Sequence, residues 1–486
     1  MNRRMIFHTV GLILEIEAAL MLLPALTSFI YREGESLAFF LSAAAVFAVG
    51  LALTLFSKPE NSVIYAREGF VTVALAWILM SAAGALPFVI SREIPSFVDA
   101  FFETVSGFTT TGASVLDDVE ALSHGALFWR SFTHWIGGMG VLVFVMAIFP
   151  SDSGRSIHIM RAEMPGPIVG KIVPKIRETA KILYLIYIVL TGVEVIFLLA
   201  GGMPLFDSLI HAFGTAGTGG FGIKSDSIAG YSPYLQWVIA IFMLIFGINF
   251  NLFYLILIGR LGQAVKSREL WCYGGIVLSA AVMIGFNIYP IYKNISDCAR
   301  LSVFQVASIM TTTGYSTCDF NKWPEFSKAV LLLLMFIGGC AGSTAGGLKV
   351  SRVILLFRMM KRDIRRMLHP RSVGVIKFEG SRIDDATLNS VSVYFSVYCL
   401  AFAVIFLLIS LEPFDFETAF SATSACFNNI GPGLGAVGAT GNYGGFSVLS
   451  KLVLIFDMLI GRLEIFPMLV LLSPGTWRVR QSSSTK

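Results

Sequence analysis

Apolar runs of about 20 residues recur along the whole chain, and short polar segments separate them. Each run is long enough to cross a bilayer core about 30 Å thick as a helix. The first two runs cover residues 6–30 and 37–56. Eight more follow in pairs, at residues 70–90 and 127–149, 182–200 and 234–258, 270–288 and 326–360, and 391–411 and 446–472. The pattern predicts an all-α polytopic membrane protein with ten spanning helices.

A shorter segment of about a dozen residues lies between the two members of each later pair, at residues 97–108, 205–217, 301–310 and 416–427. These segments are too short to span a bilayer, so we interpret them as re-entrant half-helices. Each precedes a related motif: Thr109-Thr110-Thr111-Gly112-Ala113, Thr218-Gly219-Gly220-Phe221, Thr311-Thr312-Thr313-Gly314-Tyr315 and, more distantly, Asn428-Asn429-Ile430-Gly431-Pro432. The chain therefore contains four copies of one unit.

The four units have a common orientation, because each crosses the membrane twice and so enters and leaves on the same side. Irregular backbone at membrane depth survives only inside protein or along a water-filled cavity. We therefore expect four parallel helix, pore-loop, helix repeats around a pseudo-fourfold pore, preceded by two extra transmembrane helices. The predicted boundaries are residues 1–66 for the two first helices and 67–152, 153–262, 263–367 and 368–486 for the repeats, the third with a broken second helix and the fourth with a short cytoplasmic tail.

Composition narrows the class of protein. The chain is 55% hydrophobic and 14% charged, which excludes a soluble enzyme, a disordered adaptor and a secreted disulfide scaffold. The six cysteines are scattered and form no CxxC pair, although Cys298 and Cys318 could pair outside the membrane.

Charge placement predicts the orientation in the bilayer. One set of loops holds 26 of the 36 Lys and Arg residues, whereas the alternate loops hold 7 against 15 Asp and Glu. By the positive-inside rule the first set is cytoplasmic, and both termini are inside. We expect the membrane to be the plasma (inner) membrane of a bacterium. The net charge of +5 thus reports topology and lipid contact, not nucleic-acid binding.

The four motifs carry the chemistry of alkali-cation binding. A dehydrated cation needs oxygen ligands in place of its hydration shell, and backbone carbonyls supply them where glycine lets the chain turn toward the axis. Threonine adds a hydroxyl ligand or braces the loop. One such motif is more often explained by close helix packing, but four in equivalent settings favour ion binding. The candidate ligands are Thr110, Thr111, Gly112, Thr218, Gly219, Gly220, Thr312, Thr313, Gly314, Asn429, Ile430 and Gly431.

A glycine-rich segment interrupts the second helix of the third repeat. Five glycines fall within residues 337–347, and each costs a helix about 1 kcal/mol relative to alanine. We interpret it as an unwound loop beneath the four motifs; close packing through small residues is the alternative. Its candidate functional residues are Gly338, Gly339, Gly342, Ser343, Thr344, Gly346 and Gly347.

Two charges, Arg462 and Glu464, lie near the middle of the last predicted helix, where a charge is costly and normally faces a cavity or a partner. We expect Arg462 to face the pore below the four motifs, where its positive charge would oppose cations until a gate rearranges. A structural salt bridge with Asp457 or another helix is the alternative.

The four motifs, the segment from Gly338 to Gly347 and the two leading helices together resemble the TrkH/KtrB potassium-uptake family of the Trk/Ktr/HKT superfamily, closest to its TrkH branch, over essentially the whole chain. The resemblance implies channel-like K⁺ uptake through a selectivity filter to which Gly112, Gly220, Gly314 and Gly431 each contribute. Related plant transporters that prefer sodium carry serine at the first position, so Gly112 favours K⁺. The fourth motif departs most from the Thr-Gly pattern, which leaves its ligand set least defined. The resemblance also implies that the Gly338 to Gly347 loop is an intramembrane gate and that Arg462 acts with it.

Partners and cofactors follow from the same resemblance. It implies a cytosolic TrkA-type nucleotide-binding ring, for which residues 155–181 and 352–382 are candidate contacts, and a homodimer. The chain itself offers no nucleotide site: its GxGxxG match at residues 433–438 follows no predicted strand and opens no crossover helix. K⁺ is the expected transported and filter-bound ion, with no organic cofactor.

Two other classes stay open from the residues alone. Proton- or sodium-coupled potassium symport would need a titrating carboxylate such as Glu15, Glu17, Glu194 or Glu464. An intramembrane enzyme is not expected, because the six histidines form no ligand cluster and Ser343 lacks the glycine that follows the serine of a GxSG motif.

Overall fold

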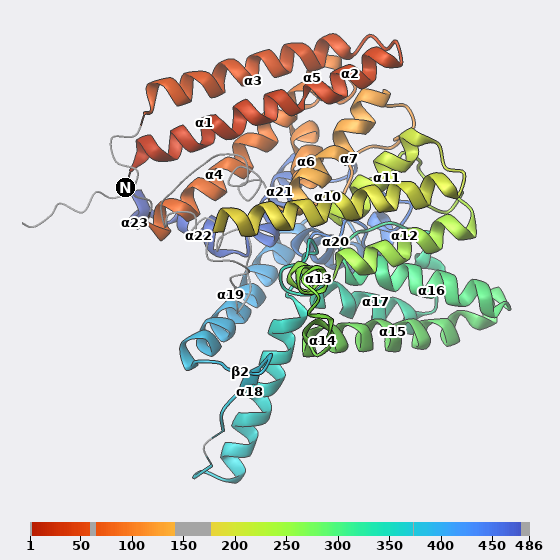
Figure 1. Cartoon of the computed structure of the whole chain (residues 1–486). Helices are drawn as coiled ribbons and strands as arrows, with labels where there is room; N and C mark the ends of the chain where they lie inside the picture. The colour runs from red at the N-terminus through yellow and green to blue at the C-terminus, as the bar shows by residue number, and fades with distance from the viewer. Residues whose placement is uncertain (1, 59–64, 141–175, 373, 478–486) are drawn as a thin grey trace, which may run out of the picture.

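The computed structural model describes residues 2–58, 65–140, 176–372 and 374–477. Within these ranges the regular elements are helices, apart from one antiparallel hairpin formed by β1 (Lys377–Phe378) and β2 (Ser381–Arg382). Long helices run side by side through the body, and one helix projects away from it (Figure 1). The predicted second helix of the first repeat, at residues 127–149, falls partly outside the described residues.

The two leading helices pack against each other. The first consists of α1 (Arg3–Leu20) and α2 (Leu22–Ile30), and the second is α3 (Ser36–Phe56). Their backbones approach closely where Gly11 faces Gly50, because a Cβ on Gly11 would lie 2.8 Å from the Gly50 carbonyl oxygen. Two extra helices ahead of the repeats are therefore present as predicted.

Each repeat begins with a long apolar helix. In chain order these are α4 (Ala66–Gly84) continued by α5 (Leu86–Ser91), α10 (Ile176–Ala200), α15 (Arg268–Tyr292) and α19 (Asp385–Ile409). Their outer faces carry exposed large hydrophobic side chains, such as Leu278 and Phe286 on α15, 67% and 78% exposed. Such a contiguous apolar surface is unfavourable in water and suits contact with lipid.

The half-helices lie where the pattern predicts them. Three have the predicted bounds: α6 (Phe97–Phe108), α11 (Leu205–Gly217) and α20 (Phe416–Phe427). The other, α16 (Ile295–Met310), begins earlier than predicted because the Asn294 side chain accepts a hydrogen bond from the Ser296 N–H and caps the helix there.

The second helices of the second, third and fourth repeats are interrupted, whereas that of the first repeat is described only as far as residue 140. The four second helices start with α7 (His124–Gly138), α12 (Pro233–Phe246), α17 (Glu325–Ile337) and α21 (Val448–Arg462). After the interruptions the chain continues in α13 (Phe250–Leu257), α18 (Val350–Leu368) and α22 (Phe466–Leu472). The shorter elements are α14 (Leu261–Val265), α23 (Pro474–Trp477) and two 3-10 turns, η1 (Phe320–Lys322) and η2 (Gly435–Val437).

The continuous helices predicted at residues 234–258 and 446–472 are therefore wrong. The first bends by 91° between α12 and α13, where the Asn249 side chain caps the new helix. The second breaks after Arg462, where Glu464 and Ile465 both have positive φ. Among the described residues, six unbroken helices are long and apolar enough to span a membrane, or seven if the bent pair counts as one span.

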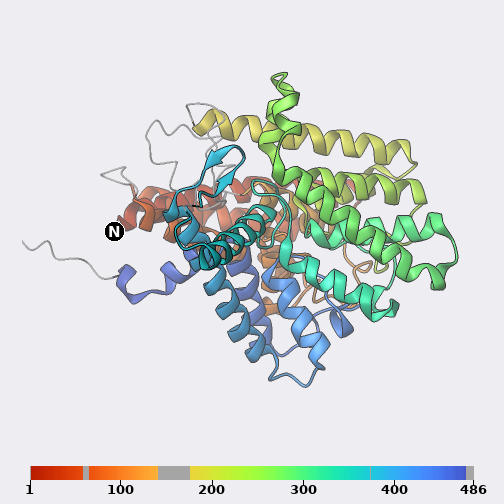
Figure 2. The same cartoon turned by 90° about the horizontal axis from the view of Figure 1, so that it is seen from below.

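The half-helices and second helices alternate in a closed ring. Each second helix contacts its own half-helix and the half-helix of the next repeat, and α21 closes the ring on α6. In Figure 2 the second repeat (yellow to light green), the third (green to teal) and the fourth (blue) lie on successive sides of the molecule. The fold is thus four parallel repeats around one axis.

Candidate ion pathway

The four motifs share one backbone conformation. Two residues before the glycine of each motif, the backbone is in the left-handed region: φ is 56° at Thr110, 54° at Thr218, 56° at Thr312 and 55° at Asn429. The glycine itself also has positive φ in each motif: 81° at Gly112, 77° at Gly220, 86° at Gly314 and 92° at Gly431. Non-glycine residues seldom adopt positive φ, so a fourfold recurrence marks a shared, imposed geometry.

The preceding half-helices hold these turns in place. The Thr111 N–H donates to the Ser106 carbonyl and the Thr313 N–H to the Ser308 carbonyl, each at 2.8 Å. The other two loops repeat this bond from Gly219 to Gly214 at 2.9 Å and from Ile430 to Ala425 at 2.8 Å. Each loop is therefore a continuation of its half-helix, and the N–H groups are turned back toward the helix.

The loops meet one another in a fixed rotational order. A Cβ on Gly112 would collide with the Gly219 carbonyl oxygen of the second loop, and one on Gly220 with the Thr313 oxygen of the third. A Cβ on Gly314 would collide with the Ile430 oxygen, and one on Gly431 would lie 2.6 Å from the Thr111 oxygen. Four carbonyls thus face four glycines around the axis, and no side chain fits at the glycine positions.

Side chains connect the loops laterally. The Asn429 amide donates to the Thr111 hydroxyl at 3.0 Å, which joins the fourth loop to the first. The Tyr443 hydroxyl donates to the Gly431 carbonyl at 2.7 Å. Tyr315 of the third motif reaches the Phe221 carbonyl of the second at 3.2 Å. The fourth motif, although least like the others in sequence, is therefore tied into the same ring.

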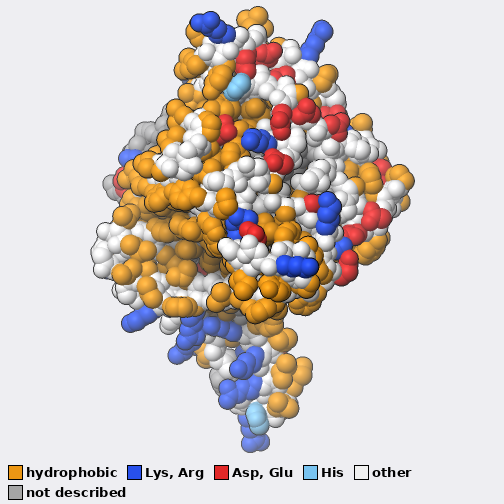
Figure 3. All heavy atoms as spheres, turned by 90° about the vertical axis from the view of Figure 1, so that its right-hand side faces the viewer, with side chains coloured by type: hydrophobic (Ala, Val, Ile, Leu, Met, Phe, Trp, Pro, Cys, Tyr) orange, Lys and Arg blue, Asp and Glu red, His pale blue; other side chains and the backbone are white. Residues whose placement is uncertain are grey.

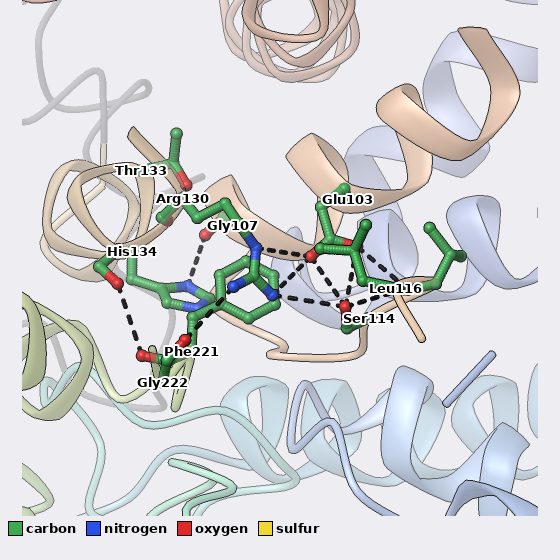
Figure 4. A network of polar contacts seen from close by, with 11 residues as sticks. Glu103, Gly107, Ser114, Leu116, Arg130, Thr133, His134, Phe221 and Gly222 are labelled. Carbon is green, nitrogen blue, oxygen red and sulfur yellow. Dashed lines mark hydrogen bonds and ion pairs between the residues drawn. The ribbon is translucent and has the colours of Figure 1, made fainter. Parts of the chain in front are cut away.

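A buried ion pair supports the first two loops from behind and was missed in the sequence (Figure 4). Arg130 of α7 and Glu103 of α6 lie 2.6 Å apart, with almost no exposed surface on either side chain. Glu103 also accepts from the Ser114 hydroxyl and the Val115 N–H, and the Arg130 guanidinium stacks over the Phe221 ring at 4.0 Å. The sequence did contain a signal for this pair: one acidic and one basic residue lie within two mainly apolar helices, where an unpaired charge would be costly.

Cavities lie on both sides of the ring. One, of about 130 Å³, is lined by all four motif glycines and by the loops that follow the motifs. The other, of about 50 Å³, is lined by the glycine-rich loop together with Asn429, Arg462 and Glu464. The four motifs therefore separate two polar cavities along the axis.

The loop between α17 and α18, residues 338–349, lies directly beneath the ring. The Gly346 N–H donates to the Thr312 hydroxyl of the third motif at 2.6 Å. A Cβ on Gly346 would also collide with the Asn428 carbonyl oxygen of the fourth motif. The segment is unwound as predicted, and it contacts two of the four motifs.

Neighbouring helices clamp this loop from the sides. The Cys340 N–H donates to the Gly247 carbonyl, and the Phe250 N–H to the Gly342 carbonyl, both at 3.0 Å, so the bend between α12 and α13 holds one side. Glu269 of α15 holds both ends: its Oε1 accepts from the Ala341 N–H at 2.8 Å and the Ser351 N–H at 3.1 Å. Sequence reasoning missed Glu269, because nothing local connects it with a loop about 70 residues away.

Arg462 lies where the loop, the ring and α7 meet. Its guanidinium donates to the Thr110 hydroxyl at 3.2 Å, the Thr344 carbonyl at 3.0 Å and the Gly138 carbonyl at 2.8 Å, and also to the Gly137 carbonyl. One side chain thus joins the first motif, the glycine-rich loop and the end of α7. This placement, below the ring, is the one predicted for Arg462.

Glu464 has a different partner. It forms a close ion pair with Arg352 of α18, whose Nη1 lies 3.0 Å from Oε1. The Lys349 ammonium, also buried, donates to the Ala345 carbonyl within the loop. The sequence predicts cytoplasmic charge for both Arg352 and Lys349, and a candidate partner contact for Arg352, but the structure places both against the loop. Cys298 and Cys318, a candidate pair in the sequence, are both free thiols and form no disulfide.

These features define a polytopic helical membrane protein in which four pseudo-equivalent loops surround one axis. The model of the TrkH family of cation transport proteins matches residues 35–270 and 291–477, so the chain belongs to this family.

Individual relatives match over nearly their full length. The chain is 40% identical to the Trk system potassium uptake protein TrkH of Salmonella typhimurium and 39% identical to that of Escherichia coli K12, over 98% of this chain and 100% of each relative. The crystal structure of the potassium transporter TrkH from Vibrio parahaemolyticus aligns with a TM-score of 0.89 and 35% identity, over 98% of this chain and 100% of that one. The predicted family and fold are therefore confirmed, and a transport family also confirms that the chain is not an enzyme.

Proposed function

We propose that the chain conducts K⁺ into the cell through the ring formed by the four motifs, which act as a selectivity filter. The observation that carries this proposal is the fourfold recurrence of one backbone conformation, with a carbonyl of each loop facing the glycine of the next. Carbonyl rings replace the hydration shell of a potassium ion. The relatives named as potassium uptake proteins and a potassium transporter support the choice of ion.

The loop of residues 338–349, with Arg462, forms the proposed gate. It lies beneath the filter and contacts two filter loops directly. The guanidinium of Arg462 places a positive charge beside this path, which raises the barrier for a cation. Opening then requires Arg462 to leave the Thr110 hydroxyl and the α7 carbonyls to which it donates, and the loop to leave the Thr312 hydroxyl.

The proposed orientation has both termini and the glycine-rich side of the ring in the cytoplasm of a bacterial cell, at the inner membrane. A cytosolic nucleotide-binding ring of TrkA type would dock on this face and bias the gate, and two copies of the chain would form the membrane unit. The name "Trk system" of the relatives supports a multicomponent assembly.

Coupled symport with protons or sodium is the second candidate. It is favoured by Glu17 and Asp457, buried carboxylates without a hydrogen-bond partner in the described part of the chain. An unpaired carboxylate in an apolar site favours its protonated form, and such a group can carry a proton if its access alternates.

Uptake of radioactive rubidium into proteoliposomes that contain this chain alone separates the two. A selective channel is expected to be blocked by external K⁺ but not by Na⁺ or Li⁺, and to be indifferent to an imposed pH gradient. Uptake that requires the pH gradient would establish symport, and Asp457→Asn should then abolish it. Equal block by Na⁺ and K⁺ would overturn the proposed filter.

A further inference from the structure

A third cavity, of about 720 Å³, lies away from the ion pathway, between the second half of α18, the segment that follows it, and the beginnings of α15 and α19. Eight of its fourteen lining residues are Lys or Arg, among them Arg268, Arg362, Arg365, Arg366 and Arg371, and one is acidic, Asp385. We call it the basic cavity. Nothing in the proposed conduction path uses it.

Positive charge in the basic cavity is poorly balanced. Arg362 lies 2.9 Å from Asp363 and 3.5 Å from Asp385. For the other seven lining cations, no ion pair occurs within the described ranges of the chain. Like charges gathered around one volume repel each other, so a multiply charged anion in that volume would be held by several of them at once.

The position of the cavity along the spanning helices indicates that it lies at the membrane surface. Arg268 is the first residue of α15 and Asp385 the first of α19, and both helices are long and apolar enough to span. A cavity between the starts of two spanning helices lies at the level of the lipid headgroups. Basic pockets at this position suit the phosphates of anionic lipids.

The projecting helix has the character of an interfacial helix. Exposed apolar side chains recur along α18 at Phe357, Met360, Ile364 and Met367, the last 80% exposed, with basic residues on its other faces. Lys and Arg gather beside hydrophobic side chains on the lower projection in Figure 3, which α18 forms in Figure 1. A basic amphipathic helix lies along the boundary between headgroups and acyl chains.

We propose that the basic cavity binds the phosphate headgroup of an anionic phospholipid of the inner leaflet, with diphosphatidylglycerol, which carries two phosphates, as the best match to its charge. The inference rests on the orientation proposed above, which places this face in the cytoplasm. A recess of this size at headgroup depth suits a lipid phosphate better than the broad surface of a docked protein.

The test is lipid retention by the purified full-length chain in a neutral detergent, measured by native mass spectrometry during titration with diphosphatidylglycerol or phosphatidylcholine. The cavity variant combines Arg365→Gln, Arg366→Gln and Arg371→Gln. The matched control removes three exposed cations of the same face that do not line the cavity, with Arg260→Gln, Lys266→Gln and Arg382→Gln. Unchanged gel-filtration profiles and thermal unfolding temperatures establish that both variants fold.

The wild-type chain and the control should bind diphosphatidylglycerol alike, and the cavity variant at least about tenfold more weakly, because three of the eight lining cations are removed. The proposal would be overturned if both variants bound diphosphatidylglycerol equally weakly, or if the wild-type chain bound phosphatidylcholine as tightly as diphosphatidylglycerol.

A second arm separates lipid from other phosphates and from protein. Bound lipid can be displaced by inorganic pyrophosphate or by added diphosphatidylglycerol. If pyrophosphate acts at the lower concentration, the cavity binds a soluble phosphate and the proposal is overturned. A cavity variant that loses a co-expressed cytosolic partner but keeps its lipid would overturn it as well. Because these measurements need no ion flux, they stand or fall separately from K⁺ conduction.

Discussion

Glycine is required at four positions of the ring for two separate reasons. The backbone has positive φ there, and the place of a side chain is taken by a carbonyl of the neighbouring loop. Either reason alone would tolerate some substitution, because a strained φ costs about 1–3 kcal/mol. Together they mean that any larger residue must push a carbonyl away from the position where it would bind an ion.

Gly314→Ser should therefore reduce discrimination between K⁺ and Na⁺. The new Cβ would displace the Ile430 carbonyl, and a loss of about 1.4 kcal/mol in selectivity corresponds to about tenfold. The measurement is competition by Na⁺ against rubidium uptake. Gly259→Ser is the matched control, because φ there is 76° and nothing lies within 4 Å of a Cβ. Unchanged competition in Gly314→Ser would remove Gly314 from the filter.

Arg462→Ala should raise the resting rubidium flux. It removes a positive charge from below the ring and the hydrogen bonds that join Thr110, Thr344 and the end of α7. Arg462→Lys, which keeps the charge but cannot form the same fork of bonds, should give an intermediate flux. Arg300→Ala, at an ion pair with Asp297 away from the loop, serves as control. A resting flux equal to wild type in Arg462→Ala would make Arg462 purely structural.

Residue identities predicted much of this site, but not its contacts. Glycine and threonine in four equivalent places were enough to find the ring, because composition and spacing are local. Arg130 and Glu103, which join α7 to α6, are 27 residues apart in the sequence. Asn429 and Thr111, which join the fourth loop to the first, are 318 residues apart. Such pairings depend on how the repeats close around the axis, which no local pattern contains.

At the scale of elements, three of the second helices are interrupted within the described residues, yet the sequence revealed only one interruption. The third repeat carries five glycines in its break, a strong local signal. The second bends around Gly247 and Asn249, which both have negative φ. The fourth breaks after Arg462, where the non-glycine residues Glu464 and Ile465 have positive φ. There the packing of the loop and ring overrides helix propensity, which is a weak preference that tertiary contacts can outweigh.

Glu269 should restrain the glycine-rich loop. Glu269→Ala would leave the Ala341 and Ser351 N–H groups without their carboxylate acceptor, and a hydrogen bond contributes about 0.5–1.5 kcal/mol net. We expect faster amide hydrogen exchange in residues 338–349 and a higher resting rubidium flux. Glu325→Ala, whose carboxylate is 88% exposed, is the control. Exchange as slow as in wild type would show that other contacts hold the loop.

The whole molecule has two chemically different ends. The end that faces the viewer in Figure 3 shows many Asp and Glu side chains, whereas Lys and Arg gather on the projecting α18. This agrees with the loop charges from which the orientation was predicted. The order and direction of the repeats could be predicted because each unit is bounded by apolar runs, but the ring that joins α21 to α6 is a property of the folded chain alone.

The orientation can be tested with single cysteines and a membrane-impermeant maleimide. Lys293→Cys, at the end of α15, should be labelled in intact cells, and Arg260→Cys, between α13 and α14, only after permeabilisation. The wild-type chain, with its own six cysteines, gives the background. Labelling of Arg260→Cys in intact cells would reverse the proposed orientation without affecting the fold.

The fusion of four units into one chain has a genetic consequence. In a channel made of four identical subunits, one codon change alters the pore at four places at once. Here one codon reaches one quarter of the ring, as Asn429 and Ile430 illustrate beside three threonine-rich or glycine-rich neighbours. Each quarter of the ring can therefore change without the other three, so the proposed filter can be altered one loop at a time.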